Sequence, residues 1–236
     1  PFYHKLIIPF LIPFLLMMAI GPKLKWIKSQ LEDKIYLISF LIISILLAFL
    51  VLKNFNQNIL INTILISSAL YLFFMTSRDF FVKKYKNISQ NIAHFGFSLL
   101  ILSILFNNLF ATEIITNLKV GETFENSKTK IVFENVDQKK EKNYNAIVAN
   151  FFISNLNGEE DRFSPELRIY NQPVIATSEA DIKTTLMSDK FIVINLVQNQ
   201  DFFNVRYQVK PFMLWIWLSV ILISFGGIVS FLQKRS

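Results

Sequence analysis

The fold of this chain is decided by residues 92–111, which read IAHFGFSLLILSILFNNLFA. The run has no acidic side chain, lysine or arginine, and as a helix it is long enough to cross about 30 Å of hydrocarbon. Its one ionisable side chain is His94, one of two histidines in the chain. We predict a membrane span here, followed by an extramembrane domain, because the residues after it become polar.

Four further apolar runs are long enough, or nearly so, to cross a membrane. With them the sequence predicts an α-helical integral membrane protein of about five spans, in keeping with 53% hydrophobic residues, 25 phenylalanines and a mean hydropathy of +0.42. Pro9 and Pro13 lie in the first run, so this helix is kinked or is the end of a helix that begins upstream. The four runs cover residues 6–21, 35–52, 59–75 and 212–232.

Positive charge alternates between the two sides of these spans. The loops after the first, third and fifth spans are basic, whereas the loop after the second holds only Lys53. Under the positive-inside rule the C-terminus lies in the cytoplasm or matrix, and residues 113–210 lie in the periplasm or intermembrane space. We therefore predict a multi-pass protein of a bacterial or mitochondrial inner membrane. The basic loop residues are Lys23, Lys25, Lys28 and Lys34, then Arg78, Lys83, Lys84 and Lys86, then Lys234 and Arg235.

Residues 113–210 differ in composition from the spans. They hold 14 acidic and 12 basic residues, against 3 and 12 in the rest of the chain. Three stretches are rich in β-branched and aromatic side chains, which is typical of strands, and they cover residues 146–153, 190–197 and 202–209. Asn157 and Gly158 form a turn signal after the first stretch, and residues 198–201 turn the second back into the third.

The sequence therefore divides into three parts. We predict spans one to four in residues 1–112 and a small β-rich extramembrane domain in residues 113–210. The last span and a cytoplasmic tail follow in residues 211–236.

Several classes of function are excluded by composition. The chain has no cysteine, so it forms no disulfide and offers no thiolate to a metal. The net charge of +7 comes from loops between apolar runs, which argues against nucleic acid as a partner. We assign no catalytic residues, since no glycine-rich phosphate loop and no Ser/His/Asp set is present. The acidic residues 159–161 follow a turn, and we interpret them as a solvated loop rather than a metal site.

His94 is the candidate ligand for a cofactor. An ionisable side chain inside a bilayer is costly without a partner, and neutral imidazole is a good ligand of haem iron. Ala93 and Gly96 are small, so a flat macrocycle or another helix can come close to this face. The alternative is that His94 snorkels to the interface or hydrogen-bonds to a neighbouring helix. His4 precedes the first span, and we place it in the interface.

The start of the last span has the composition of an interfacial anchor. Trp215 and Trp217 follow Lys210 and Pro211, and tryptophan is enriched where a span enters the headgroup region. Arg206 and Lys210 suit an anionic group, either lipid phosphates or a ligand such as the haem propionates. We favour lipid.

A series of stretches in fixed order resembles the CcmF family of cytochrome c-type biogenesis proteins. The resemblance covers nearly the whole chain but only the C-terminal half of that family, so we expect a natural split product or a fragment. The stretches are AIGP (19–22) with Trp26, IAHFG (92–96), NYNA (143–146), PELRIY (165–170), TSEADI (177–182), SDKFIV (188–193), VR (205–206), KPFMLWIWL (210–218) and GG (226–227).

The resemblance implies a component of the haem lyase complex, which transfers haem to apocytochrome c and attaches it there. It implies an internal haem b with His94 as one axial ligand of the iron, and the other axial histidine in the N-terminal half of the family. Implied partners are haem, a haem chaperone, apocytochrome c, thiol-handling subunits, the N-terminal half, and quinol as electron source. Whether this chain itself acts as an enzyme stays open.

Two other classes of function remain. The first is a transporter or permease subunit with an extracytoplasmic domain, which is disfavoured if His94 is the one buried ionisable group in the spans. The second is a structural scaffold whose β-rich domain binds partner proteins while the histidine has no role.

Overall fold

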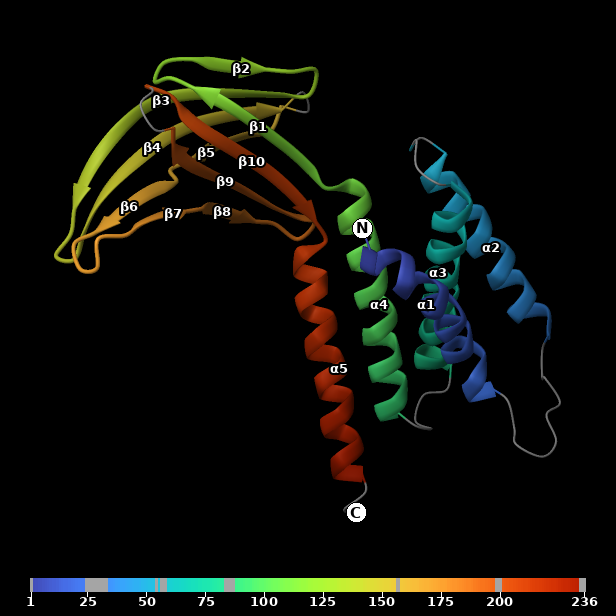
Figure 1. The fold of residues 1–236 in the computed structure, drawn as a ribbon. Helices are drawn as coiled ribbons and strands as arrows, with labels where there is room; N and C mark the ends of the chain where they lie inside the picture. Colours follow the sequence, from blue (N-terminus) through green and yellow to red (C-terminus); the bar gives the residue numbers. More distant parts are fainter. Residues whose placement is uncertain are drawn as a thin grey trace. The chain divides into compact units, whose positions relative to one another are not determined.

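The computed structural model describes residues 2–23, 34–53, 55, 59–82, 88–155, 158–197 and 201–233. The chain forms two compact units, which are Pro1–Asn108 with Trp215–Ser236, and Leu109–Leu214. The first unit is helical and the second is built from β-strands (Figure 1). Apolar helices with a β-sandwich between the fourth and the fifth confirm the fold class predicted from the sequence.

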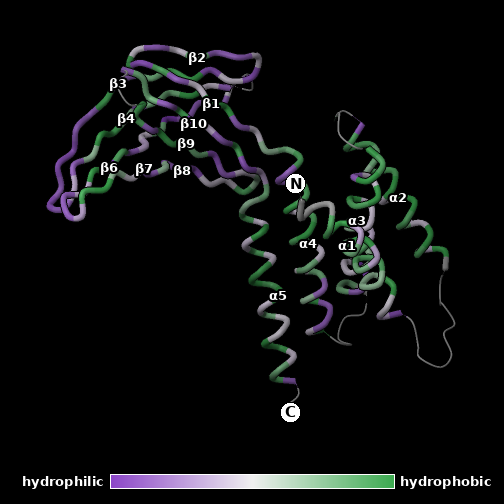
Figure 2. The backbone as a smooth tube through the Cα atoms, in the orientation of Figure 1, coloured by the Kyte–Doolittle hydropathy of each residue, from purple (hydrophilic) through white to green (hydrophobic). Residues whose placement is uncertain are grey.

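The helical unit consists of long segments coloured as hydrophobic over most of their length in Figure 2. In hydrocarbon a helix satisfies its own backbone groups, so a long apolar run adopts it. Among the described residues, five helices are long and apolar enough to cross a membrane. The elements are α1 (Phe2–Ile20) with the 3₁₀ turn η1 (Gly21–Lys23), α2 (Lys34–Leu52), α3 (Ile59–Val82), α4 (Ile88–Phe110) and α5 (Met213–Gln233).

Two helix ends differ from the prediction. Helix α3 continues seven residues beyond residue 75, and α4 begins four residues before residue 92. Arg78 and Asp79 therefore lie in a helix, and the prediction that His94 is the one buried ionisable group in the spans is wrong. Hydropathy ended α3 too early because Asp79 is polar, whereas the fold pairs it with the Lys23 ammonium at 2.7 Å.

Several loop residues used in the sequence analysis lie outside the described residues. This applies to Lys25, Lys28, Lys83, Lys84, Lys86, Lys234 and Arg235, to Trp26, and to the side chain of Lys34.

Two glycines determine how closely the backbones of α4 and α5 approach each other. A Cβ on Gly226 of α5 would lie 2.8 Å from the backbone nitrogen of Ala93 and 2.9 Å from the carbonyl oxygen of Ser89. A Cβ on Gly96 of α4 would lie 3.0 Å from Ile223 of α5. Only residues without a side chain allow this backbone separation, which is how small residues bring membrane helices together.

The second unit is a β-sandwich of two antiparallel sheets. One sheet has the strand order β1-β10-β9-β8, and the other has the order β2-β3-β4-β6-β7, with β5 also paired to β4. The three predicted strands overlap β4, β9 and β10. The strands are β1 (Thr112–Leu118), β2 (Thr123–Glu125), β3 (Thr129–Lys140), β4 (Tyr144–Asn155), β5 (Glu160–Phe163), β6 (Glu166–Tyr170), β7 (Ala176–Glu179), β8 (Asp181–Thr184), β9 (Ser188–Leu196) and β10 (Phe203–Pro211).

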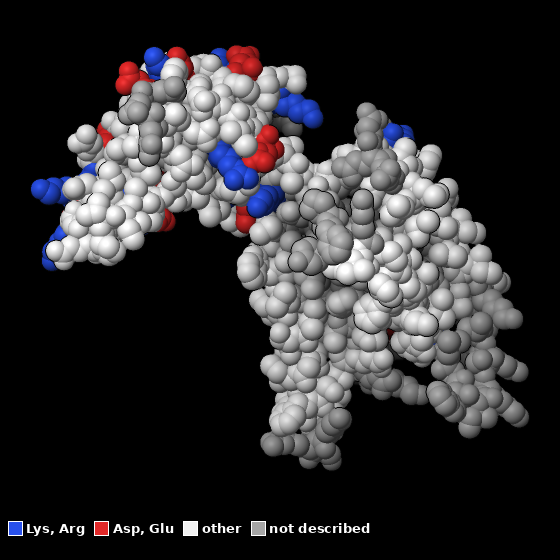
Figure 3. Space-filling view, viewed as in Figure 1, with Lys and Arg blue, Asp and Glu red and all other residues white. Residues whose placement is uncertain are grey.

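The sandwich core is made by alternate residues of the facing strands. Phe133 of β3 stacks on Phe151 of β4 with ring centroids 4.4 Å apart, and Phe203 of β10 meets Phe133 edge to face at 5.4 Å. Burying one such ring is worth about 1.5–3 kcal/mol. The full cluster is Leu118, Ile131, Phe133, Ala149, Phe151, Ile153, Phe163, Leu167, Ile192, Ile194, Val205 and Tyr207. Charged side chains lie on the outside of the sandwich in the face shown in Figure 3.

One lysine lies inside the sandwich. Lys190 of β9 is only 9% exposed, and its ammonium is 2.6 Å from a carboxylate oxygen of Glu159 and 2.9 Å from one of Asp161. Lys183 of β8 reaches Asp161 at 3.3 Å. The interpretation of residues 159–161 as a solvated loop is therefore wrong for Asp161, which lies in β5 and joins the two sheets. Its partners are 22 and 29 residues away, so no local pattern announces them.

These contacts shift the pKa values of Asp161 and Lys190. Burial alone raises the pKa of the Asp161 carboxyl, but hydrogen bonds from Lys190 and Lys183 outweigh it, so this pKa is lowered. Burial alone lowers the pKa of Lys190, and the hydrogen bonds that its ammonium donates to Glu159 and Asp161 raise this pKa overall. Both ions are thus stabilised in the folded state.

We predict that Lys190→Met destabilises the chain by about 1–3 kcal/mol, because it leaves a half-buried carboxylate without its main donor. The measurement is thermal unfolding of the full chain in detergent, followed by near-ultraviolet circular dichroism. Lys130→Met is the matched control, since Lys130 is half-exposed and lies 3.8 Å from Glu125. An equal loss of thermal stability in the two variants would show that the contacts of Lys190 with Asp161 and Glu159 add no stability beyond that of a surface ion pair.

The same pair predicts a pH dependence. Because the folded pKa of Asp161 lies below its unfolded value of about 3.9, its contribution is complete above that value and disappears as the pH falls through the folded pKa. The difference in melting temperature between the wild type and Lys190→Met should therefore shrink below about pH 4. A difference that stays constant down to pH 2 contradicts this assignment.

We also predict that Gly226→Leu destabilises the helical unit by about 1–3 kcal/mol, because its side chain would collide with the α4 backbone. Gly227→Leu is the control, since a Cβ at Gly227 meets nothing within 4 Å. The measurement is the melting temperature of the far-ultraviolet helix signal in detergent. If both variants melt together, α4 and α5 are not packed through Gly226.

Candidate functional site

His94 lies on α4, six residues after Ile88, which is about 9 Å along the helix axis. Its side chain is half-buried. On the α1 side, the ring of Phe97 meets that of Phe14 edge to face at 5.9 Å. The apolar sequence of α4 makes it a helix, and its neighbours determine which faces are covered.

Helix α3 covers a second face of α4. The ring of Phe95 lies 5.5 Å from that of Phe73 and 5.9 Å from that of Phe80. The hydroxyls of Thr76 and Ser98 are 3.1 Å apart and bridge the two helices. Each hydroxyl also lies within hydrogen-bond distance of a carbonyl of its own helix, so the hydroxyl that does not donate to its neighbour can donate there, and the polar groups cost little inside the bundle.

A small polar hollow adjoins His94. Its volume is about 10 Å³, which is enough for about one water molecule. Residues of α1, η1, α3 and α4 line it, and several of them carry hydrogen-bonding groups. The lining consists of Met18, Ala19, Pro22, Met75, Thr76, Asp79, Gln90, Asn91 and His94.

An ion pair adjoins this hollow through Asp79. The side chains of Lys23 and Asp79 are 6% and 14% exposed, and the Asn91 amide donates to the Asp79 carbonyl oxygen at 3.3 Å. The pair lies after the end of α1 and three residues before the end of α3. Transport sites lie near the middle of a membrane, so a pair at the helix ends does not favour a transporter.

The small residues beside His94 have a structural role. From the sequence, Ala93 and Gly96 allow either a macrocycle or a helix to come close. In the structure both residues lie against α5, Ala93 at Gly226 and Gly96 at Leu222 and Ile223. This face of α4 is therefore occupied by a helix.

The residues around His94 meet only part of the requirements of a haem site. A half-buried neutral imidazole is a suitable axial ligand for iron. The adjoining hollow is far too small for a porphyrin, and the part of the chain that the structure describes holds no group of three His, Asp or Glu placed to bind a metal. The donor fits haem, whereas the walls of a haem pocket are not formed by the described residues.

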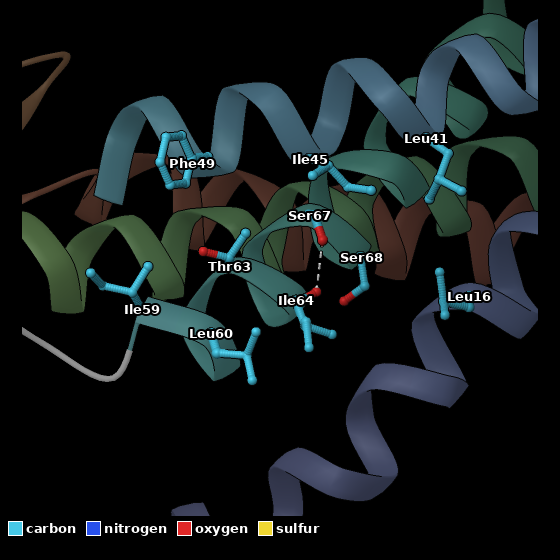
Figure 4. A pocket seen from close by; sticks show the side chains of 10 residues that line it. All are labelled: Leu16, Leu41, Ile45, Phe49, Ile59, Leu60, Thr63, Ile64, Ser67 and Ser68. Atoms are coloured by element: carbon cyan, nitrogen blue, oxygen red, sulfur yellow. Dashed lines mark hydrogen bonds between the residues drawn. The ribbon is translucent and has the colours of Figure 1, made fainter. Parts of the chain in front are cut away.

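A larger and mostly apolar hollow lies elsewhere in the helical unit (Figure 4). It has a volume of about 620 Å³ between α1, α2 and α3. Its polar groups are hydroxyls, and that of Ser67 donates to the Ile64 carbonyl at 3.0 Å, the dashed line in Figure 4. The lining has no ionisable side chain and consists of Leu16, Leu41, Ile45, Phe49, Ile59, Leu60, Thr63, Ile64, Ser67 and Ser68.

Of the two predicted anion-binding residues, Arg206 is already engaged by a carboxylate. Arg206 of β10 donates to the Glu113 carboxylate of β1, as does the Gln208 amide. Hydrogen bonds from Gln208 and then Arg206 lower the pKa of Glu113. The Lys210 ammonium lies 5.2 Å from the centre of the Phe191 ring. The contact that the structure shows for Arg206 is thus the Glu113 carboxylate of the neighbouring strand, rather than a phosphate or a propionate.

The remaining predicted residues stand as follows. Trp215 and Trp217 are on the first turn and a half of α5, and Trp217 is exposed. His4 belongs to α1, but its side chain lies outside the described residues. Sequence reasoning missed the Lys23–Asp79 pair, whose one signal was an acidic residue isolated between apolar runs.

Comparison with known proteins finds similarity to the same group of proteins in both units. The family model "CcmF C-terminal beta-sandwich" matches residues 109–211. Cytochrome c-type biogenesis protein CcmF of Haemophilus influenzae is 25% identical over 251 residues, which is 100% of this chain and 39% of that protein. The CcmF of Escherichia coli is 22% identical, again over 100% of this chain and 38% of that protein. Cytochrome c-type biogenesis protein ccl1 of Rhodobacter capsulatus is 30% identical over 61% of this chain and 22% of that protein.

A solved structure shares the fold. "Cytochrome c Heme Lyase CcmF" superimposes with a TM-score of 0.70 at 21% identity, covering 97% of this chain and 40% of that one. The chain thus spans about two fifths of the length of the relatives that it matches end to end. Since both the β-sandwich and the whole-length similarity point the same way, the chain resembles the C-terminal part of the CcmF family of cytochrome c-type biogenesis proteins along its whole length.

Proposed function

We propose that the chain acts in the haem ligation step of cytochrome c maturation, as the C-terminal part of a haem lyase in an inner membrane. The observation that carries this is similarity over the entire chain, spans and β-sandwich alike, to proteins named for cytochrome c biogenesis. A relative of the same fold is named as a cytochrome c haem lyase. Haem and apocytochrome c are then the substrates of the assembled lyase.

We place His94 as one axial ligand of a haem b inside the membrane. In support, its imidazole is half-buried in an apolar bundle, beside a hollow large enough for about one water. A hydrogen bond from a ligand's second nitrogen to a neighbour orients the ring, and Asn91 and Thr76 supply polar groups there. A bound haem would supply one-electron redox chemistry.

The rest of the haem site must come from outside the described residues. The adjoining hollow cannot admit a porphyrin, and α5 covers the small residues of α4. We therefore assign the second axial histidine and the pocket walls to the N-terminal half of the family. We assign no site to quinol, because the lining of the 620 Å³ hollow offers no group that takes up its protons.

We place the β-sandwich on the periplasmic or intermembrane-space side. The basis is the alternation of lysine and arginine between loops and the mixed charge of residues 113–210. This is the side on which apocytochrome c, a haem chaperone and thiol-handling subunits would meet it. The sandwich then serves as their docking domain.

We predict that His94→Ala removes most of the b-type haem absorbance from the chain reconstituted with its N-terminal half, because the iron loses an axial ligand. The measurement is the reduced-minus-oxidised spectrum of the purified assembly at equal protein. His4→Ala is the matched control, since it removes the other histidine of the chain.

The same pair of variants separates a haem protein from a scaffold. Partner proteins should co-purify with His94→Ala while the haem spectrum is lost. A spectrum that survives His94→Ala at full intensity excludes this residue as a ligand, and leaves the role in the lyase to be judged from apocytochrome c conversion alone.

A further inference from the structure

The hairpin that joins β8 to β9 ends in two large apolar side chains. Leu186 and Met187 occupy the tip and are 60% and 57% exposed. The turn is well formed: Thr185 N donates to the Ser188 carbonyl at 2.9 Å, and Ser188 N donates to the Thr185 hydroxyl at 3.1 Å. Hairpin tips in water carry Gly, Asn or Asp, so two bulky hydrophobic residues on an ordered tip need an apolar environment.

This tip is tied to the first residue of a membrane span. The backbone nitrogen of Phe212 donates to the Met187 carbonyl at 2.8 Å, and α5 begins at the next residue, Met213. Figure 1 shows the β8–β9 turn beside the end of β10. The tip therefore lies within one hydrogen bond of the point where the chain enters α5.

The corner itself is rigid. Phe212 has a φ of 61°, which a bulky residue adopts only when its surroundings hold it there. The register pairs Pro211 with Ser188 and Lys210 with Asp189 immediately before the corner. The turn and the start of the span consequently keep a fixed separation.

We propose that Leu186 and Met187 form an interfacial anchor that inserts into the lipid boundary of the leaflet in which α5 begins. The neighbouring groups fit a lipid surface: Trp215 and Trp217 follow on α5, and Lys210 supplies an ammonium for phosphate headgroups. The occupant is the bilayer rather than a protein, because the tip is continuous with a segment that itself enters the membrane.

The anchor gives the sandwich a third point of attachment. Its two covalent links leave from adjacent strands, since Thr112 of β1 pairs with Val209 of β10. Two neighbouring links act as a hinge line. The β8–β9 tip lies one to two strands away, about 5–10 Å from that line, so its insertion resists rocking about it.

The chain contains no cysteine, which permits a direct test. Met187→Cys, in the full chain and in vesicles of phosphatidylcholine with phosphatidylglycerol, is labelled with an environment-sensitive fluorophore. Doxyl lipids and aqueous iodide then quench the label from opposite sides. Val120→Cys is the matched control, because Val120 is 50% exposed in a turn beyond Leu118, about 20 Å along β1 from the spans.

We expect doxyl lipids labelled near the headgroup to quench position 187 roughly twofold more than position 120, and iodide to show the reverse order. Leu186→Cys provides a second reporter and should behave as Met187→Cys does. Iodide quenching at 186 and 187 equal to that at 120 overturns the proposal. Protection of both positions from both quenchers also overturns it, since a protein would then cover the tip.

Discussion

The structure depends on the pairing of β1 with β10. These strands follow α4 and precede α5, and their register places Thr112 opposite Val209 across almost a hundred residues of sequence. Strands in a sheet lie about 4.8 Å apart, so the pairing brings the end of one span close to the start of the next. Within the helical unit, Gly96 and Gly226 then allow α4 and α5 to pack with their backbones in contact.

The helices were largely predictable, because in hydrocarbon a long apolar run can satisfy its backbone only as a helix. Their ends were not, since the α3 extension contains Asp79, and only its pairing with Lys23 makes a carboxylate acceptable there. Three long strands, β4, β9 and β10, were predictable from their β-branched and aromatic residues. Shorter strands such as β5 and β8 gave no such signal, because distant partners define them.

The candidate site shows the same division. His94 was recognisable from residue type alone, as an imidazole in an apolar run. Ala93 and Gly96 were compatible with a macrocycle or a helix, and the fold selects the helix. The water-sized hollow and the ion pair beside it arise from residues of four elements, which no spacing in the sequence relates.

The sequence by itself determined the membrane class, the order of the spans, the β-rich insertion and the resemblance to CcmF, because hydropathy and short motifs are local properties. Only the tertiary structure decided which charges are buried, how α4 meets α5, how much space lies beside His94, and that Met187 adjoins the start of α5. These are matters of distance between residues far apart in the chain, and the physical reason is that packing and hydrogen bonding act through space.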